Sequence, residues 1–224
     1  MNDHGHFDAI AACDQYAREV IGEVVHRDCY QLEQLAARRH YDVLLDVGCN
    51  VGAVSWMARQ LNLADSVEAI ECNDFYADAY VQTMLGQGPV RLQRGYAAAL
   101  SRRKLYGAPA CEALVSVSDL LAAHQGQRVL LKMDIEGWEY PIFEELLERG
   151  QIAGNLDLVF EFHDPPSAYN QGVLHSEPGT LSATARRILI SALEASLAGA
   201  LDRPLRFLSH VHTGEYLLGV LASY

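Results

Sequence analysis

Short apolar runs that alternate with helix-forming segments occupy the middle of the chain. Residues 43–47 form an apolar run followed by a glycine, which is typical of a buried parallel strand, and the helix-forming segment 53–61 comes next. Strand patterns recur at 66–70, 90–94, 129–133 and 156–162, and helical patterns recur at 75–85 and 140–149. Strands that alternate with helices predict a Rossmann-like α/β fold with a doubly wound, mostly parallel sheet.

Both ends of the chain add further elements. Apolar residues at helical spacing between 7 and 39 predict two helices that are broken near 26–30. Toward the other end, an Ala- and Leu-rich helix over 180–201 precedes two strands, at 205–211 and 215–221. These two strands predict a hairpin that closes the sheet.

The segment 164–180 differs from its surroundings. It carries three prolines and two glycines without periodicity, which predicts a long irregular loop just after a strand end, where lids are common. No linker composition divides the chain. We therefore expect one globular unit, with an N-terminal helical cap over 1–40 and the sheet domain over 41–224.

The charge of the chain narrows the classes of partner. Its 17 Lys and Arg residues against 29 Asp and Glu residues give a formal net charge of -12, which repels nucleic acid and anionic membranes. We therefore expect no nucleic-acid or membrane partner, and a homodimer stays open. The five cysteines form no CxxC pair, and neither a leader pattern nor a run of about 18 apolar residues occurs. These features favour a reducing, cytoplasmic location.

A glycine turn joins the first predicted strand to its helix. Residues 46–52 read Asp-Val-Gly-Cys-Asn-Val-Gly, so glycines stand where the backbone passes close to a ligand and where the N–H groups of a helix start are unpaired. An acid before the turn suits a cationic ligand better than a pyrophosphate. Glu71 ends the second strand, where such folds place an acid on ribose hydroxyls. The residues assigned to cofactor binding are Asp46, Gly48, Cys49, Asn50, Gly52, Glu71 and Cys72.

The turn resembles the first motif of the class I S-adenosylmethionine-dependent methyltransferases, which has the form acid-x-Gly-x-x-x-Gly. In that class the acid after the second strand binds the ribose of S-adenosylmethionine, and an antiparallel C-terminal strand completes a seven-stranded sheet. The resemblance therefore implies S-adenosylmethionine as cofactor, with Glu71 on its ribose, and a seven-stranded sheet closed by the C-terminal hairpin.

Charged residues cluster after the fourth and fifth predicted strands. Asp134, Glu136 and Glu139 follow the fourth strand, at the sheet edge where open α/β folds bind ligands. Glu136 and Glu139 also suit the start of the next helix, because acids stabilise helix N-termini. Glu161 and His163 end the fifth strand and project on the same face by its period of two. Because buried charges are costly unless they are paired, Asp134, Glu136, Glu161 and His163 are the candidate catalytic residues.

The segment 130–147 closely resembles the FkbM-like methyltransferases, in which a strand ends in Lys-x-Asp-x-Glu-Gly and a helix follows. Glu161 and His163 match a Glu-x-His found at the next strand end in part of that group. The resemblance covers about 42–164, and Trp138 and Cys49 are modest departures from the pattern.

The resemblance implies methyl transfer to a hydroxyl oxygen of a small molecule, a sugar or a natural product. Methylation of nitrogen or of a protein side chain is the alternative within the same class. A non-catalytic S-adenosylmethionine-binding module is the alternative outside the enzymes, and the paired charges at the strand ends argue against it.

Two arrangements of the charged residues suit transfer from a sulfonium to a hydroxyl, which is an in-line displacement that removes a proton. In the first, His163 acts as general base, oriented by Glu161 or Asp134. In the second, Asp134, Glu161 and His163 hold a divalent metal ion that lowers the pKa of the acceptor. The sequence gives no distances, so both arrangements stay open.

Overall fold

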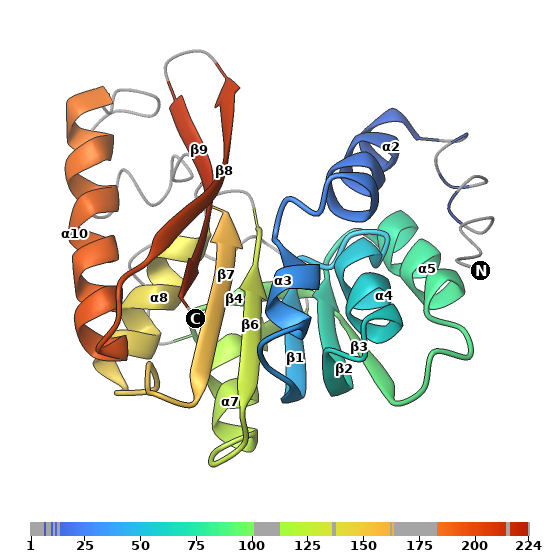
Figure 1. Cartoon of the computed structure of the whole chain (residues 1–224), viewed down its shortest axis with the longest axis horizontal. Helices are drawn as coiled ribbons and strands as arrows, with labels where there is room; N and C mark the ends of the chain where they lie inside the picture. The colour runs from blue at the N-terminus through green and yellow to red at the C-terminus, as the bar shows by residue number, and fades with distance from the viewer. Residues whose placement is uncertain are drawn as a thin grey trace.

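The computed structural model describes residues 14–100, 113–135, 138–161, 183–213 and 216–223, together with the single residues 7, 10, 12 and 163. The loop predicted at 164–180 and the candidate catalytic residue Glu136 lie outside this part of the chain. Within it, strands and helices alternate as the hydrophobic pattern predicts (Figure 1).

Seven strands form one sheet in the order β3-β2-β1-β6-β7-β9-β8. The strands that pair in parallel are β1 (Tyr41–Val47), β2 (Ala64–Glu71), β3 (Val90–Arg94), β6 (Val129–Met133) and β7 (Leu156–Glu161). The C-terminal hairpin consists of β8 (Arg206–Thr213) and β9 (Tyr216–Ser223), and β9 runs antiparallel to both β7 and β8. The predicted mostly parallel, seven-stranded sheet with an antiparallel C-terminal strand is therefore confirmed.

Helices cover both faces of this sheet (Figure 1). Those on one face are α2 (Gln15–Ile21), the π-helix η1 (Gly22–His26), α3 (Leu32–Ala36), α4 (Ala53–Gln60) and α5 (Asp74–Thr83). Those on the other face are α7 (Val117–Ala123), α8 (Glu139–Glu148) and α10 (Ala183–Leu201). None of the helices in the described ranges is both long enough and apolar enough to span a membrane.

The central strands are buried on both sides, which explains their nearly continuous apolar runs. Leu44 of β1 and Leu130 of β6 pack into the core under the N-terminal helices. Their neighbours Val43, Leu45 and Leu131 pack into the second core, under α7, α8 and α10. Successive side chains of a strand point to opposite faces, so one sequence run supplies both cores.

A small second sheet is absent from the sequence-based prediction. It consists of β4 (Tyr96–Ala98) and β5 (Leu114–Ser116), which pair in parallel, and α7 follows it directly. Strands of three residues are too short to show a period of two, so the hydrophobic pattern did not reveal them. The chain direction from β3 into β4 brings Tyr96 and Ala97 to the carboxyl edge of the main sheet, where the candidate site lies.

Candidate active site

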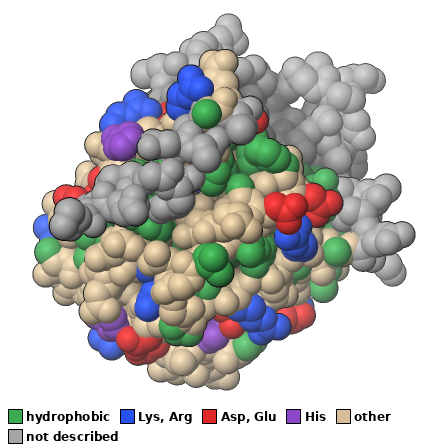
Figure 2. Space-filling view, turned by 90° about the vertical axis from the view of Figure 1, so that its right-hand side faces the viewer, with side chains coloured by type: hydrophobic (Ala, Val, Ile, Leu, Met, Phe, Trp, Pro, Cys, Tyr) green, Lys and Arg blue, Asp and Glu red, His purple; other side chains and the backbone are tan. Residues whose placement is uncertain are grey.

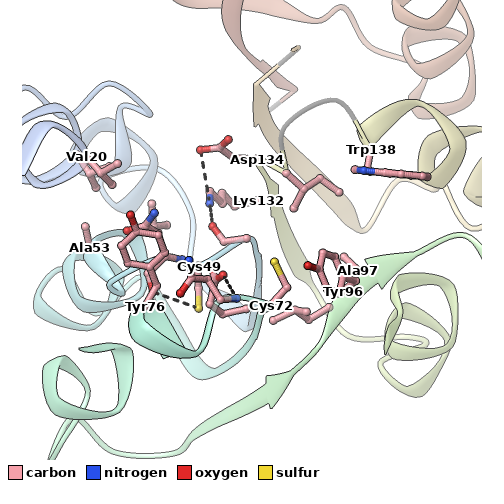
Figure 3. Close-up of a pocket in the computed structure, with 18 of the residues that line it drawn as sticks. Val20, Cys49, Ala53, Cys72, Tyr76, Tyr96, Ala97, Lys132, Asp134 and Trp138 are labelled. Atoms are coloured by element: carbon pink, nitrogen blue, oxygen red, sulfur yellow. Dashed lines mark hydrogen bonds and ion pairs between the residues drawn. The ribbon is translucent and has the colours of Figure 1, made fainter. Parts of the chain in front are cut away.

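A cavity of about 360 Å³ opens at the carboxyl ends of β1, β2 and β6. Here the strand order reverses between β1 and β6, which is where open α/β sheets bind ligands. Val20 and Tyr76 lie on one side of the cavity, and Tyr96, Ala97 and Trp138 lie on the other (Figure 3). Helix α2 and η1 also contribute to the lining, so the N-terminal segment takes part in the site. The cavity has the size of a small-molecule site.

The glycine turn between β1 and α4 leaves no room for side chains. Gly48 has a φ of +76°, and a Cβ at this position would lie 2.0 Å from the backbone oxygen of Asp134. Gly52 has a φ of +85°, and a Cβ there would lie 2.9 Å from the ring of Tyr80. Only glycine combines a left-handed backbone with so close an approach. Gly48 and the two residues after it line the cavity, whereas Gly52 faces Tyr80 instead.

Asp46 lies beneath this turn and is not among the residues that line the cavity. It is fully buried, accepts a hydrogen bond of 2.6 Å from Ser55 Oγ, and has its Oδ1 3.3 Å from Lys132 Nζ. Lys132 stands opposite Asp46 on β6 and donates a hydrogen bond of 2.6 Å to the carbonyl oxygen of Gly48. The structure therefore places Asp46 as a support of the turn, with its charge balanced by Lys132 rather than presented to a ligand.

Glu71 and Cys72 lie at the rim of the cavity, at the end of β2. The carboxylate of Glu71 is 7% exposed and accepts backbone N–H groups from Asn50 at 2.9 Å and from Asn73 at 2.8 Å, one on each oxygen. A carboxylate oxygen has two lone pairs, so each oxygen keeps one for a further donor. Glu71 can thus hold the turn and a ligand hydroxyl together.

Asp134, Glu161 and His163 form a cluster next to this cavity, and Asp134 lines it. The Nε2 atom of His163 lies 3.6 Å from Asp134 Oδ1 and 4.0 Å from Glu161 Oε1. These three candidate residues come from the ends of β6 and β7, which are paired neighbours in the sheet. The structure brings them together as the sequence predicts.

Glu139, the first residue of α8, orients the histidine of this cluster. It is fully buried, and its Oε1 lies 2.9 Å from His163 Nδ1 and accepts a hydrogen bond of 2.9 Å from the backbone N–H of Ile135. Tyr140 adds a second anchor, because its hydroxyl donates a hydrogen bond of 2.7 Å to the carbonyl oxygen of His163. The sequence indicated Glu139 only as an acid at a helix start, so its contact with His163 is new.

Two residues connect the cluster to the cavity and the glycine turn. The hydroxyl of Tyr30, between η1 and α3, donates a hydrogen bond of 2.9 Å to Asp134 Oδ2. Lys132 Nζ lies 3.9 Å from the same oxygen, between Asp134 and the glycine turn (Figure 3). No sequence pattern indicated Tyr30, whereas the Lys-x-Asp spacing on β6 places Lys132 on the same face as Asp134.

Burial and neighbouring charges shift the pKa values of two groups in the cluster. Burial alone would lower the pKa of His163, but the hydrogen bond to Glu139 and the charges of Glu139, Asp134 and Glu161 raise it to about 10. Burial, followed by the charge of Asp134, raises the pKa of Glu161 to about 7, against the opposing effect of His163. The cluster therefore favours positive charge at its centre.

Comparisons with known proteins found one family model and several solved structures to which the chain is similar. The model of the methyltransferase FkbM domain matches residues 100–189, a range that contains the whole cluster. Ribosomal protein L11 methylase from Lactobacillus delbrueckii subsp. bulgaricus is 14% identical, with 88% of this chain and 78% of that chain covered and a TM-score of 0.43. TrmK from M. capricolum, in complex with S-adenosylhomocysteine, is 10% identical, with 86% and 66% covered and a TM-score of 0.40.

A third solved structure is the fibrillarin pre-rRNA processing protein from Methanococcus jannaschii. It is 9% identical, with 82% of this chain and 66% of that chain covered and a TM-score of 0.45. No curated protein matches the chain.

The strand order, the antiparallel β9 and the cavity at the switch point are those of a Rossmann-like α/β fold. The match of residues 100–189 to the model of the methyltransferase FkbM domain agrees with the resemblance expected from the sequence.

Proposed function

We propose that this methyltransferase transfers the methyl group to a hydroxyl oxygen of a small molecule or sugar. The observation that carries the proposal is the cluster of Asp134, Glu161 and His163, which lies beside the cavity and shares Asp134 with its lining. A hydroxyl is hardly acidic in water, so its methylation requires a group that accepts the proton or lowers the pKa of the hydroxyl. Carboxylates and imidazoles can accept the proton or can hold a metal ion that lowers this pKa. An amine that arrives neutral needs no such group.

The cavity fits S-adenosylmethionine, whose bound form supplies an electrophilic methyl group on a sulfonium. The turn at Gly48 offers bare backbone, and Glu71 keeps lone pairs for ribose hydroxyls. Cys49, Asn50 and Cys72 complete the part of the lining that we assign to the cofactor.

The residues of the chain then have to align the acceptor and receive its proton. The acceptor oxygen forms a bond to the methyl carbon as the carbon–sulfur bond breaks, the bonding pair stays on sulfur, and the hydroxyl proton leaves. Asp134, which lines the cavity, and its neighbour Glu161 are carboxylates that suit this proton. Trp138 and Tyr96 provide aromatic walls against which an acceptor ring can pack.

The charge of the molecule favours a small acceptor over nucleic acid. The formal net charge is -12, and nucleic-acid binding depends on Lys and Arg contacts with phosphates. On the face drawn in Figure 2, the described Lys and Arg side chains are interspersed with Asp and Glu. Arg94 lies 3.4 Å from Asp74 and 2.5 Å from Asp78, so its charge is paired with carboxylates.

Two measurements test the proposal. Calorimetry with S-adenosylhomocysteine should give one binding site per chain, and incubation with S-adenosylmethionine should add the mass of one methyl group to members of a panel of hydroxylated acceptors. A matched panel of amines and peptides serves as the comparison. Methyl transfer to amines or peptides alone would contradict oxygen as the acceptor atom, and cofactor binding without transfer to any acceptor would favour a binding module.

A further inference from the structure

We propose that Asp134, Glu161 and His163 bind one divalent cation of the Mn²⁺ or Mg²⁺ type. Each offers one ligand atom, and these atoms lie within 4.8 Å of one another. Ligand atoms about 2.1 Å from an octahedral ion lie about 3.0 Å apart when they are cis and about 4.2 Å apart when they are trans. The two distances from His163 Nε2, 3.6 Å and 4.0 Å, are longer than the cis separation. Binding an ion therefore requires the side chains to move inward by roughly half to one ångström.

The orientation of His163 supports a role as ligand. A histidine that binds a metal is neutral, and because the Oε1 atom of Glu139 is an acceptor 2.9 Å from Nδ1, the hydrogen of such a ring would be on Nδ1 and its lone pair on Nε2, toward the two carboxylates. Histidines that bind metals commonly donate their other N–H to a carboxylate, which fixes the tautomer and the ring. Glu139 is thus a positioning residue for the cation site.

The balance of charge around the cluster points to a cation as well. Glu139 is fully buried, and its Oε2 has no hydrogen-bond partner among the described residues. Asp134 and Glu161 add two further carboxylates, which are 27% and 17% exposed. Within the described ranges, Lys132 forms an ion pair with Asp134 and also balances Asp46, and the imidazole of His163 lies between the three carboxylates. The three carboxylates favour positive charge at the position of the imidazole, and a divalent cation bound there would supply more of it than a protonated ring.

The role of the cation in catalysis rests on the proposed function. Three protein ligands would leave coordination positions for a hydroxyl oxygen, and a hydroxyl bound to a divalent ion would lose its proton more readily, to the carboxylate oxygen of Glu161 that does not bind the ion. Carboxylates suit Mn²⁺ and Mg²⁺, and the imidazole shifts the preference toward Mn²⁺.

Electron paramagnetic resonance tests the site without any turnover. The chain is first freed of metal with a chelator and desalted, and Mn²⁺ is then titrated while the signal of free Mn²⁺ is followed. We expect one Mn²⁺ per chain, displaced by excess Mg²⁺. Glu161→Gln and His163→Gln should weaken binding at least about tenfold, and Glu139→Gln should weaken it about 10- to 100-fold through the lost orientation of the ring.

His40→Ala is the matched control. His40 Nε2 lies 2.9 Å from Asp65 Oδ1, so it forms an exposed histidine–carboxylate pair that is not part of a three-residue cluster. Its removal should leave Mn²⁺ binding unchanged. Thermal melts of each variant check folding, and Glu161→Gln, at a partly exposed position, remains informative if the buried Glu139→Gln does not fold.

Failure of this inference is distinguishable from failure of the proposed function. A native chain that binds no Mn²⁺, or a Glu161→Gln variant that binds it as the native chain does, overturns the cation site. Calorimetry with S-adenosylhomocysteine on the same metal-free samples reports on the cofactor site separately. Cofactor binding without Mn²⁺ binding would overturn only the cation, whereas Mn²⁺ binding without cofactor binding would overturn only the proposed methyl transfer.

Discussion

The carboxylate of Glu71 is shared between the protein backbone and the cavity. One oxygen holds the N–H of Asn50 in the glycine turn, and the other holds the N–H of Asn73 at the start of α5. A ligand hydroxyl bound to the same carboxylate would therefore be coupled to the turn itself. This sharing distinguishes Glu71 from Asp46, whose partners are all on the protein side of the turn.

Glu71→Gln should weaken S-adenosylhomocysteine binding by about 1–3 kcal/mol, because hydrogen bonds to a charged acceptor are lost. In addition, the new amide N–H₂ is a donor and cannot accept a hydrogen bond from one of the two backbone N–H groups. Calorimetry on the folded variant measures the loss. The control is Glu68→Gln on the same strand, whose side chain lies near Arg91 and His124, and it should leave the affinity unchanged. An unaltered dissociation constant for Glu71→Gln would place the ribose elsewhere.

Gly48→Ala should abolish measurable S-adenosylhomocysteine binding. The new Cβ would meet the backbone oxygen of Asp134 at 2.0 Å, so either the turn or Asp134 has to move. Gly86→Ala is the control, because Gly86 has a similar φ of +78° but no heavy atom within 4 Å of its added Cβ. Both variants incur backbone strain of about 1–2 kcal/mol, visible as a lower melting temperature. Equal affinity in the two variants would contradict the placement of the cofactor at this turn.

Asp157 ties together three segments at the opposite edge of the sheet. It is the second residue of β7 and is 1% exposed. Its carboxylate accepts the hydroxyl of Tyr41 at 2.5 Å and lies 2.9 Å from Arg39 Nη1 and 2.7 Å from Arg203 Nη2. The start of β1, the end of α3 and the end of α10 therefore meet at one buried charge.

Asp157→Ala should destabilise the fold by about 3–5 kcal/mol, because it leaves the largely buried Arg203 without its counter-charge and the buried Tyr41 hydroxyl without its acceptor. Thermal or denaturant unfolding measures the change, and Asp65→Ala, which removes an exposed partner of His40, should cost less than about 1 kcal/mol. Since Asp157 lies far from the carboxyl edge of the sheet, the folded variant should keep its S-adenosylhomocysteine affinity. A loss of affinity in the folded protein would show that the two edges are coupled.

The strands and helices of the main sheet follow from local sequence, whereas the contacts within the site do not. Strands β3 and β6 have the bounds that the apolar runs predict, because buried parallel strands carry a strong local pattern. The hydrogen bond from Tyr30 to Asp134 joins residues 104 positions apart, and the contact between His163 and Glu139 spans 24. Hydrophobic periodicity is a property of one short segment, so it cannot reveal contacts between distant segments.

The position of Asp46 shows the same limit. The motif predicts an acid at the turn, but whether its carboxylate contacts a ligand or another side chain depends on the register between β1 and β6. That register sets Asp46 opposite Lys132, and the lysine neutralises it. The face of β1 on which Asp46 lies follows from the period of two. Its partner, Lys132, follows only from the pairing of the strands.

The net charge of the molecule leads to a prediction about nucleic acid. Sequence-independent binding of nucleic acid, with dissociation constants of about 10⁻⁴–10⁻⁶ M, comes from Lys and Arg contacts that release counterions. A chain with a formal net charge of -12 repels the phosphates, which weakens such binding. We therefore expect no change in the fluorescence anisotropy of labelled tRNA at chain concentrations up to about 100 µM and about 0.15 M salt.

Lower salt separates a weak interaction from none. If phosphate contacts existed, the binding constant would rise steeply as the salt concentration falls, with a slope set by the number of contacts. For this chain, repulsion becomes stronger at low salt because the Debye length grows from about 8 Å at 0.15 M to about 30 Å at 0.01 M. The anisotropy should therefore stay unchanged at both salt concentrations. Transfer of labelled methyl to tRNA should be absent under conditions in which a hydroxylated small acceptor is methylated. Binding that appears as salt is lowered would instead identify a local basic surface strong enough to overcome the charge of the whole chain, and the small-acceptor proposal would then be wrong.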